Sequence, residues 1–156
     1  MGEKTQREVD IYAQAAAVCA CANFRKVSRT VTQLFDHALQ PSGLRSTQFI
    51  ILLEIATAPS PTIALLARRL VMDPSTVTRN LRPLEKQGLI KAVSTENRRG
   101  RVLTLTLEGY EMVEQVVPLW ERTQNLFIKK VGQKRWSILF KHLQATVTIA
   151  HGISHF

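Results

Sequence analysis

The spacing of hydrophobic residues along the chain predicts a mainly helical protein. From about Val9 to Leu39 no proline or glycine interrupts the sequence, and apolar side chains such as Phe24, Val27 and Val31 recur every three or four residues. This spacing places them on one stripe of a helix. We therefore predict one long helix over residues 9–39. Its first half is small and apolar nearly all round, which favours burial by a partner.

Shorter helical segments follow, each bounded by residues that start or stop helices. Ser46 can cap a helix over residues 47 to about 58, and Thr62 can cap a short helix over residues 63–70. Towards the C-terminus the same periodicity predicts two more helices, over residues 108–130 and 134–149. The two are separated by Gly132.

The segment from Asp73 to Gly88 has both a start and a stop signal for a helix. Asp73 can accept backbone N–H bonds, Pro74 suits the first helical position, and Gly88 suits a left-handed cap. One face of this helix is apolar, and the other carries hydroxyls and arginines: Ser75, Thr76, Thr78, Arg79 and Arg82. A short helix, a tight turn and a capped polar helix have the spacing of a helix-turn-helix, whose second helix can enter a major groove.

Two β-like runs come directly after this helix, over residues 89–94 and 102–106. The loop that joins them is basic and contains Arg98, Arg99 and Arg101. A hairpin at this position makes the element a winged helix-turn-helix. The fold class that follows is mainly α with a small β-hairpin.

The net charge of +9 is concentrated around this element. Residues 68–101 include nine basic and only three acidic side chains, so this segment has a net charge of +6. A localised positive field favours a polyanionic partner, although a solvated basic face that serves solubility is the alternative. The chain has no apolar run long enough to span a bilayer, and its N-terminus is polar, so we expect a cytoplasmic protein without a membrane partner.

Short motifs distributed along the chain together resemble the MarR family of bacterial regulators. They are GLRSTQF at residues 43–49, DPSTVTR at 73–79, LEKQGLI at 84–90, NRRGR at 97–101 and LTLEG at 105–109. The resemblance extends over residues 9–151. It implies one MarR-type domain over residues 1–156, with a winged DNA-binding lobe at 44–107 and dimerisation helices at 8–40 and 108–153.

The resemblance also implies a function. A homodimer would bind a pseudo-palindromic double-stranded DNA operator in the bacterial nucleoid, as a repressor rather than an activator, and a small ligand or cysteine oxidation would release it. The DNA-binding residues would be Ser75, Thr76, Thr78, Arg79, Arg82, Arg98, Arg99 and Arg101. The family's wing commonly reads Asp-x-Arg, and here Asn97 stands at the Asp position, before Arg99, our candidate for minor-groove insertion.

Two cysteines, Cys19 and Cys21, are candidates for a redox sensor. Cys21 falls where the hydroperoxide sensors of the resembled family place a reactive cysteine, but the positions of their tyrosines hold Phe35 and Ser46 here. A small buried hydrophobe and a metal ligand are the other interpretations. On one straight helix, side chains two residues apart point about 200° apart, which opposes a shared metal ion. We predict no metal site and no cofactor.

Four apolar residues, Phe24, Phe35, Phe49 and Leu52, are candidate walls of an effector pocket, and equally candidates for the core. The chain has no glycine-rich phosphate loop, nucleophile elbow or metalloprotease motif, so we predict that it is not an enzyme. The alternative functions are a thiol-dependent peroxide-reactive protein and a winged-helix module that binds another protein.

Overall fold

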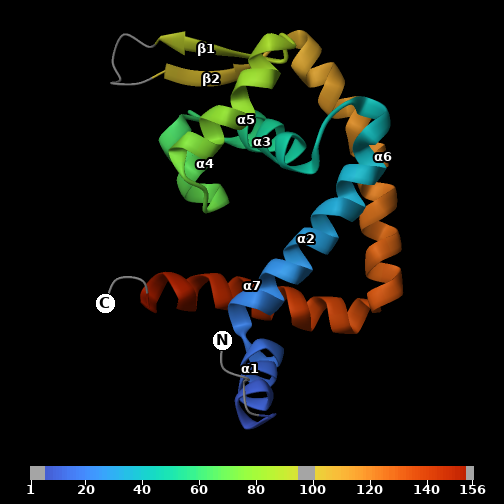
Figure 1. The fold of residues 1–156 in the computed structure, drawn as a ribbon. Helices are drawn as coiled ribbons and strands as arrows, with labels where there is room; N and C mark the ends of the chain where they lie inside the picture. Colours follow the sequence, from blue (N-terminus) through green and yellow to red (C-terminus); the bar gives the residue numbers. More distant parts are fainter. Residues whose placement is uncertain (1–5, 95–100, 154–156) are drawn as a thin grey trace.

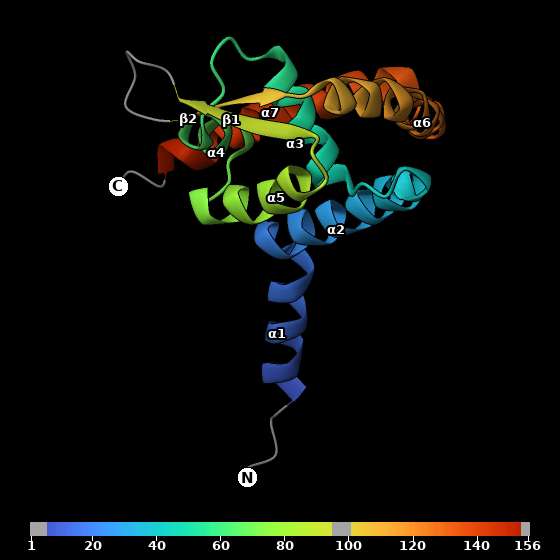
Figure 2. The same cartoon turned by 90° about the horizontal axis from the view of Figure 1, so that it is seen from above.

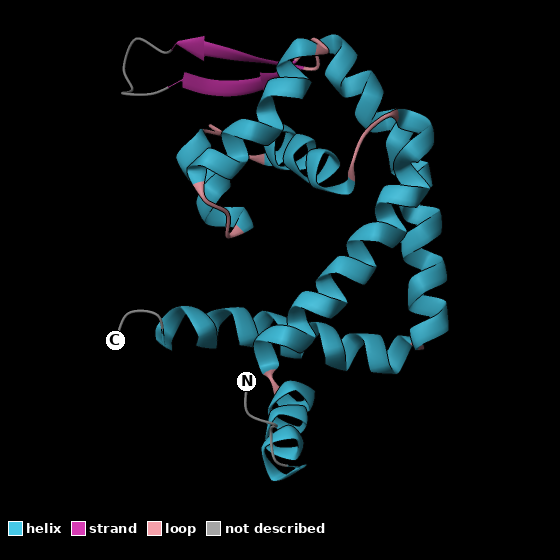
Figure 3. Ribbon diagram, viewed as in Figure 1, coloured by secondary structure: helices cyan, strands magenta, loops and turns pink. Residues whose placement is uncertain are grey.

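Helices form most of the molecule, and two antiparallel strands form one hairpin (Figures 1 and 3). The computed structural model describes residues 6–94 and 101–153. The elements in chain order are α1 (Gln6–Val18), α2 (Ala20–Leu39), the 3-10 turn η1 (Gln40–Ser42), α3 (Ser46–Thr57), α4 (Ile63–Leu70), α5 (Pro74–Lys86), β1 (Ile90–Ser94), β2 (Arg101–Leu105), α6 (Leu107–Val131) and α7 (Gln133–Ile153). This confirms the predicted fold class.

The winged lobe, which consists of α3, α4, α5, β1 and β2, encloses its own hydrophobic core. Phe49 of α3, Leu66 of α4 and Leu84 of α5 are almost completely buried together. Val116 of α6 is also fully buried and belongs to the same core. The lobe therefore folds around contacts made within one chain.

Both strands attach the hairpin to the lobe, since Ile90 of β1 is buried in the same core as residues of β2. Ile90 pairs with Leu105, and Ala92 pairs with Leu103. Leu103 and Leu105 are buried, and the Leu103 N–H donates to the Pro61 carbonyl at 2.8 Å. Because alternate residues of β2 face the core, the hairpin is held at a defined position beside α5.

The remaining helices form what we call the platform: α1, residues 20–34 of α2, residues 121–131 of α6, and α7. In Figures 1 and 2, α6 leads away from the hairpin, α7 turns back beneath the lobe, and α1 projects from the end of α2. No side chain of α7 is buried, and the described side chains of α1 are all exposed. Within one chain, the platform has almost no core.

The prediction of one helix over residues 9–39 is wrong, because the chain leaves helical geometry at Cys19. Its ψ of 111° is extended, and α1 and α2 are separate helices. The Asn23 side-chain amide donates to the carbonyls of Ala17 and Cys19, both at 3.0 Å. Neither proline nor glycine is needed for the break, since the Asn23 side chain supplies a donor to the Ala17 carbonyl, which the break leaves without its helical partner.

Two predicted helix caps also differ. Ser46 is the first residue of α3 rather than its cap, and both its N–H and its hydroxyl donate to Asp36 of α2, at 2.7 and 2.6 Å. The Asp73 side chain makes no cap bond; its backbone carbonyl accepts from Thr76 and Val77 instead.

Other predicted boundaries agree with the structure to within a few residues. Residues 63–70 form α4, with the Leu65 N–H donating to the Thr62 hydroxyl at 3.1 Å. Gly88, with φ of 71°, has the left-handed geometry predicted for the end of α5. Among the helices of residues 6–94 and 101–153, none combines the length and apolar composition that a bilayer span requires.

Candidate nucleic-acid interface

Helix α5 presents a polar face to solvent because its apolar face is anchored in the lobe. Val77, Leu81 and Leu84 are buried at helical spacing. The opposite face exposes Ser75 and Arg79 of the first turns and Arg82 further on. All three were predicted from the sequence as DNA-binding residues. Lys86 lies on the same exposed face and was overlooked, although its spacing of four from Arg82 places it there.

The two threonines of this helix lie at the sides of the exposed face. Thr76 and Thr78 are half-buried, and the Thr78 hydroxyl donates to the Pro74 carbonyl at 2.8 Å. The Asn80 amide donates in the same way to the Thr76 carbonyl at 2.9 Å. With its proton engaged, the Thr78 hydroxyl offers a groove an acceptor oxygen and a methyl group.

The turn between α4 and α5 contains a strained residue. Val71 has a φ of 53°, the left-handed region that β-branched residues rarely adopt, and its side chain is 59% exposed. The next residue, Met72, donates its N–H to the Ala67 carbonyl at 2.8 Å and so closes the end of α4. Val71 also lines a shallow hollow with Val147, Ala150 and His151 of α7. The lobe and the platform therefore approach each other at this turn.

The wing contributes one described arginine. Arg101 is exposed at the start of β2, opposite Ser94. Asn97, Arg98 and Arg99, the other wing residues named from the sequence, lie outside the described residues.

The base of the wing is joined to α6 by Thr106. Its hydroxyl donates to the Gly88 carbonyl at 2.6 Å and accepts from the Gly109 N–H at 3.0 Å. A Cβ on Gly109 would collide with the Leu89 carbonyl, so only glycine allows this close approach of α6 to the end of α5. Sequence periodicity gives no indication of this contact, because the two backbones meet through tertiary packing.

Glu108 is the one described group at this junction with a shifted pKa. Its pKa is lowered chiefly by a hydrogen bond from its own backbone N–H, and also by the positive charge of Lys91. A carboxylate in the first turn of α6 also interacts favourably with the helix dipole.

Both cysteines are free and exposed in the single chain, so no contact within the described chain buries them. Cys19 lies in the extended break between α1 and α2, and Cys21 lies in the first turn of α2. The argument that one straight helix holds the two thiols apart therefore does not apply. No cluster of three potential metal ligands occurs among the described residues.

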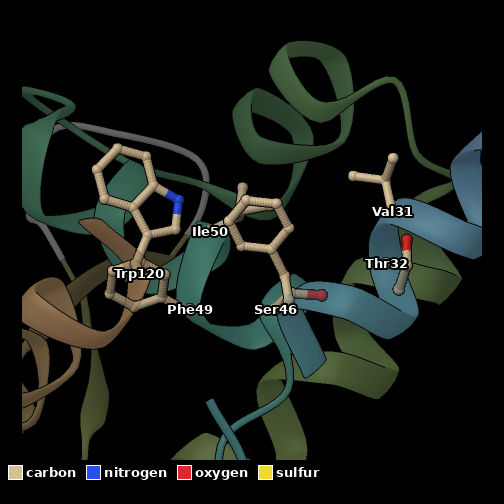
Figure 4. Close-up of a pocket in the computed structure, with 7 residues that line it drawn as sticks. Val31, Thr32, Ser46, Phe49, Ile50 and Trp120 are labelled. Atoms are coloured by element: carbon tan, nitrogen blue, oxygen red, sulfur yellow. The ribbon is translucent and has the colours of Figure 1, made fainter. Parts of the chain in front are cut away.

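The candidate pocket residues separate into two cavities and the core (Figure 4). Phe35 and Phe49 line a cavity of about 210 Å³ between α2, α3 and α6, and in Figure 4 the labelled side chains of Phe49, Ile50 and Trp120 lie around it. Phe24 and Phe35 line a second cavity of about 290 Å³ between α2, α6 and α7. Leu52 lines neither of these two and belongs to the core of the lobe.

Comparison with known proteins identifies the type of lobe that these elements form. A family model described as MarR family matches residues 42–100, which include α3, α4, α5 and β1. No curated protein sequence matches the chain.

Similar solved structures align over most of the chain. The M. tuberculosis transcriptional regulator MosR in complex with DNA is 31% identical, with 86% of this chain and 97% of that chain covered and a TM-score of 0.78. MosR in a second crystal structure is 30% identical, with coverages of 88% and 99% and a TM-score of 0.78. A mutant of MarR from E. coli complexed with operator DNA, at 22% identity, shares the fold, with coverages of 85% and 96% and a TM-score of 0.76. Over nearly its whole length, then, this chain belongs to the MarR family of transcriptional regulators.

Proposed function

We propose that the protein binds a double-stranded DNA operator as a homodimer, with α5 of each chain in a major groove and the wing beside it, and so represses transcription. The observation that carries this proposal is the exposed face of α5, where Ser75, Arg79 and Arg82 project from a helix anchored by buried leucines. The structural relative MosR is described in complex with DNA, which supports the same partner here.

The side chains divide into those that read bases and those that hold the backbone. Arg79 lies in the first turns of α5 and can donate two hydrogen bonds to guanine O6 and N7, a contact that typically contributes about 1–3 kcal/mol of discrimination. Ser75, Thr76 and Thr78 flank it as short-range contacts to bases or phosphates. Arg82, Arg98, Arg99 and Arg101 would bind phosphates, with Arg99 entering a minor groove.

The test is binding to the DNA that flanks the protein's own gene. Arg79→Ala should weaken operator binding at least about tenfold and relax base preference at one position of each half-site, whereas Arg99→Ala should mainly reduce the salt dependence. Lys26→Ala, which removes an exposed charge from α2, serves as the matched control and should bind normally. If both arginine variants bind the operator like the control, the docking of α5 and the wing is wrong.

The second copy of the chain would cover the platform. Large apolar side chains are exposed on α1, α2 and α7, among them Ile11, Phe24, Leu139 and Phe140. Exposed apolar surface of this extent is typical of an interface. We assign residues 8–40 and 108–153 to dimerisation and residues 44–107 to the DNA-binding lobe. Two lobes related by a two-fold axis would contact half-sites about one helical turn apart.

A ligand would act through the cavity between α2, α3 and α6. Its aromatic lining of Phe35, Phe49 and Trp120 suits a small apolar or aromatic molecule. Ser46 also lines this cavity and donates two hydrogen bonds to Asp36, so that a ligand there would press on the contact that joins α2 to the lobe.

Oxidation of a cysteine is the second route to release. A hydroperoxide would oxidise the exposed Cys21 thiol to a sulfenic acid and would itself be reduced to an alcohol. If this route operates, peroxide abolishes the gel shift of the wild-type protein but leaves that of Cys21→Ser intact. Loss of the shift in both proteins would exclude Cys21 as the sensor. In either route the protein acts by binding in the cytoplasm rather than by catalysis.

A further inference from the structure

The platform carries a second group of positive charges, separate from those of the lobe. After Glu121 the sequence contains no acidic residue, but it contains six basic ones: Arg122, Lys129, Lys130, Lys134, Arg135 and Lys141. We call these six residues the corner cluster, because they surround the turn between α6 and α7. All are exposed, and none forms a salt bridge with a carboxylate of the described chain.

The corner cluster is too distant from the wing to reinforce its field. Lys129 follows Leu107, the first residue of α6, by 22 residues, which corresponds to about 33 Å of helix. Figures 1 and 2 both show the α6–α7 turn at the opposite end of α6 from the hairpin. Exposed charges are largely screened beyond about 8 Å at physiological ionic strength. The cluster is thus an independent electrostatic feature.

Helix stability does not explain the position of these charges. Lys129 and Lys130 in the last turn of α6 interact favourably with its dipole, but Lys134 and Arg135 lie in the first turn of α7, where a positive charge is unfavourable. The two pairs also repel each other across Gly132. An arrangement that opposes the stability of its own helices indicates a partner that neutralises it.

Dimerisation would leave the corner cluster exposed to solvent. Trp136 and Phe140 lie on one stripe of α7, whereas Lys134 and Lys141 lie on the opposite side of the helix, together with the exposed Ile138. Lysine is depleted from the cores of protein interfaces because its ammonium group is costly to desolvate. A second copy that covers the apolar stripe therefore leaves the lysines in solvent.

We propose that the corner cluster binds the phosphate backbone of a second DNA duplex, so that one dimer holds its operator through the lobes and another stretch of DNA through the platform. This inference rests on operator binding by the lobes. Exposed lysines and arginines without nearby base-reading elements fit phosphates of any sequence. The operator duplex cannot itself supply the second segment over a short length, since DNA is stiff over about 150 bp.

The experiment is capture of a labelled duplex without the operator by protein bound to an immobilised short operator. Wild-type protein should capture the second duplex at low salt. A variant with K129Q, K130Q, K134Q and R135Q should bind the operator normally but capture at least about tenfold less of the second duplex. The matched control with K129R, K130R, K134R and R135K keeps every charge and should capture like the wild type. Equal capture by the glutamine variant, or no capture by the wild type, would overturn the proposal.

A second measurement keeps the cluster testable apart from the lobes. In a background in which Arg79, Arg82, Arg98, Arg99 and Arg101 are all replaced by Ala, binding to operator-free duplex should depend mainly on the cluster. The four glutamines should make the slope of log affinity against log salt shallower by about 3–4, since each phosphate contact contributes about 0.9. An unchanged slope would refute the cluster's role. Failure of the wild-type protein to bind the operator would refute only the proposed function.

Discussion

The winged lobe and the platform of this protein differ in whether contacts within one chain bury their hydrophobic residues. In the lobe, Phe49, Leu52, Leu66 and Leu84 are at most 1% exposed, and the core is closed by α6 of the same chain. In the platform, α7 has no buried residue, and Phe140 remains 46% exposed. The lobe can thus fold from its own contacts, whereas the platform depends on surface that it does not supply itself.

This difference separates two kinds of stability. Burial within one chain stabilises the lobe independently of protein concentration, while burial against a second copy stabilises the platform by mass action. A regulator built in this way can keep the recognition helix rigid within each lobe and still allow the platform to alter the distance between two lobes.

The largest loss of stability is expected from a substitution at the junction of α6 with the lobe. Gly109→Ala places a methyl group against the Leu89 carbonyl, and because backbone cannot yield as a flexible side chain does, we expect a loss of about 4 kcal/mol of unfolding free energy. Gly152→Ala, in the open on α7, is the control and should be neutral or slightly stabilising. Chemical denaturation measures both, and similar stabilities would show that the junction relaxes.

A core substitution in each region tests the comparison directly. Leu52→Ala should cost about 3 kcal/mol at every protein concentration, because it leaves a cavity in the lobe. Phe140→Ala should instead weaken association, and its thermal midpoint should fall further on dilution than that of the wild type. Sedimentation and thermal unfolding at two concentrations distinguish these outcomes. A concentration-independent loss for Phe140→Ala would mean that the platform is stabilised within one chain.

The turn where the regions approach each other offers a stabilising change. Val71→Gly should raise the free energy of unfolding by about 1 kcal/mol. The left-handed backbone costs a β-branched residue about 1–2 kcal/mol, and the greater entropy of glycine in the unfolded chain offsets part of the gain. Thermal unfolding provides the measurement. A lower midpoint would show that the apolar contact of Val71 with α7 outweighs its backbone strain.

The smallest expected effect concerns Glu108 and its pH dependence. A carboxyl whose pKa is lowered by folding stabilises the protein above its unfolded pKa, and this contribution disappears as the pH falls through the folded value. Glu108→Gln should therefore be slightly less stable than the wild type at pH 7. The two proteins should converge in acid, as denaturation at both pH values can establish. A difference that persists in acid would point to lost packing instead.

Much of the molecule could be predicted from local sequence. Helical periodicity and the caps at Thr62 and Gly88 predicted α4 and the end of α5 correctly, and the spacing of Val77 and Leu81 indicated which face of α5 is polar. These features succeed because they depend on residues three or four positions apart. The charges of the corner cluster are equally visible in the sequence, but their separation from the wing needed the course of α6.

The sequence by itself therefore determined most of the helices, the hairpin and the polar face that makes α5 suitable for a DNA groove. The tertiary structure decided where those elements are joined: Asp36 of α2 binds the start of α3, Gly109 allows α6 to touch the Leu89 carbonyl, and Asn23 supports the break at Cys19. The first two contacts join residues 10 and 20 positions apart, and the third replaces a missing helical bond with a side chain. Periodicity records which way a side chain faces, but not which distant backbone group it will meet.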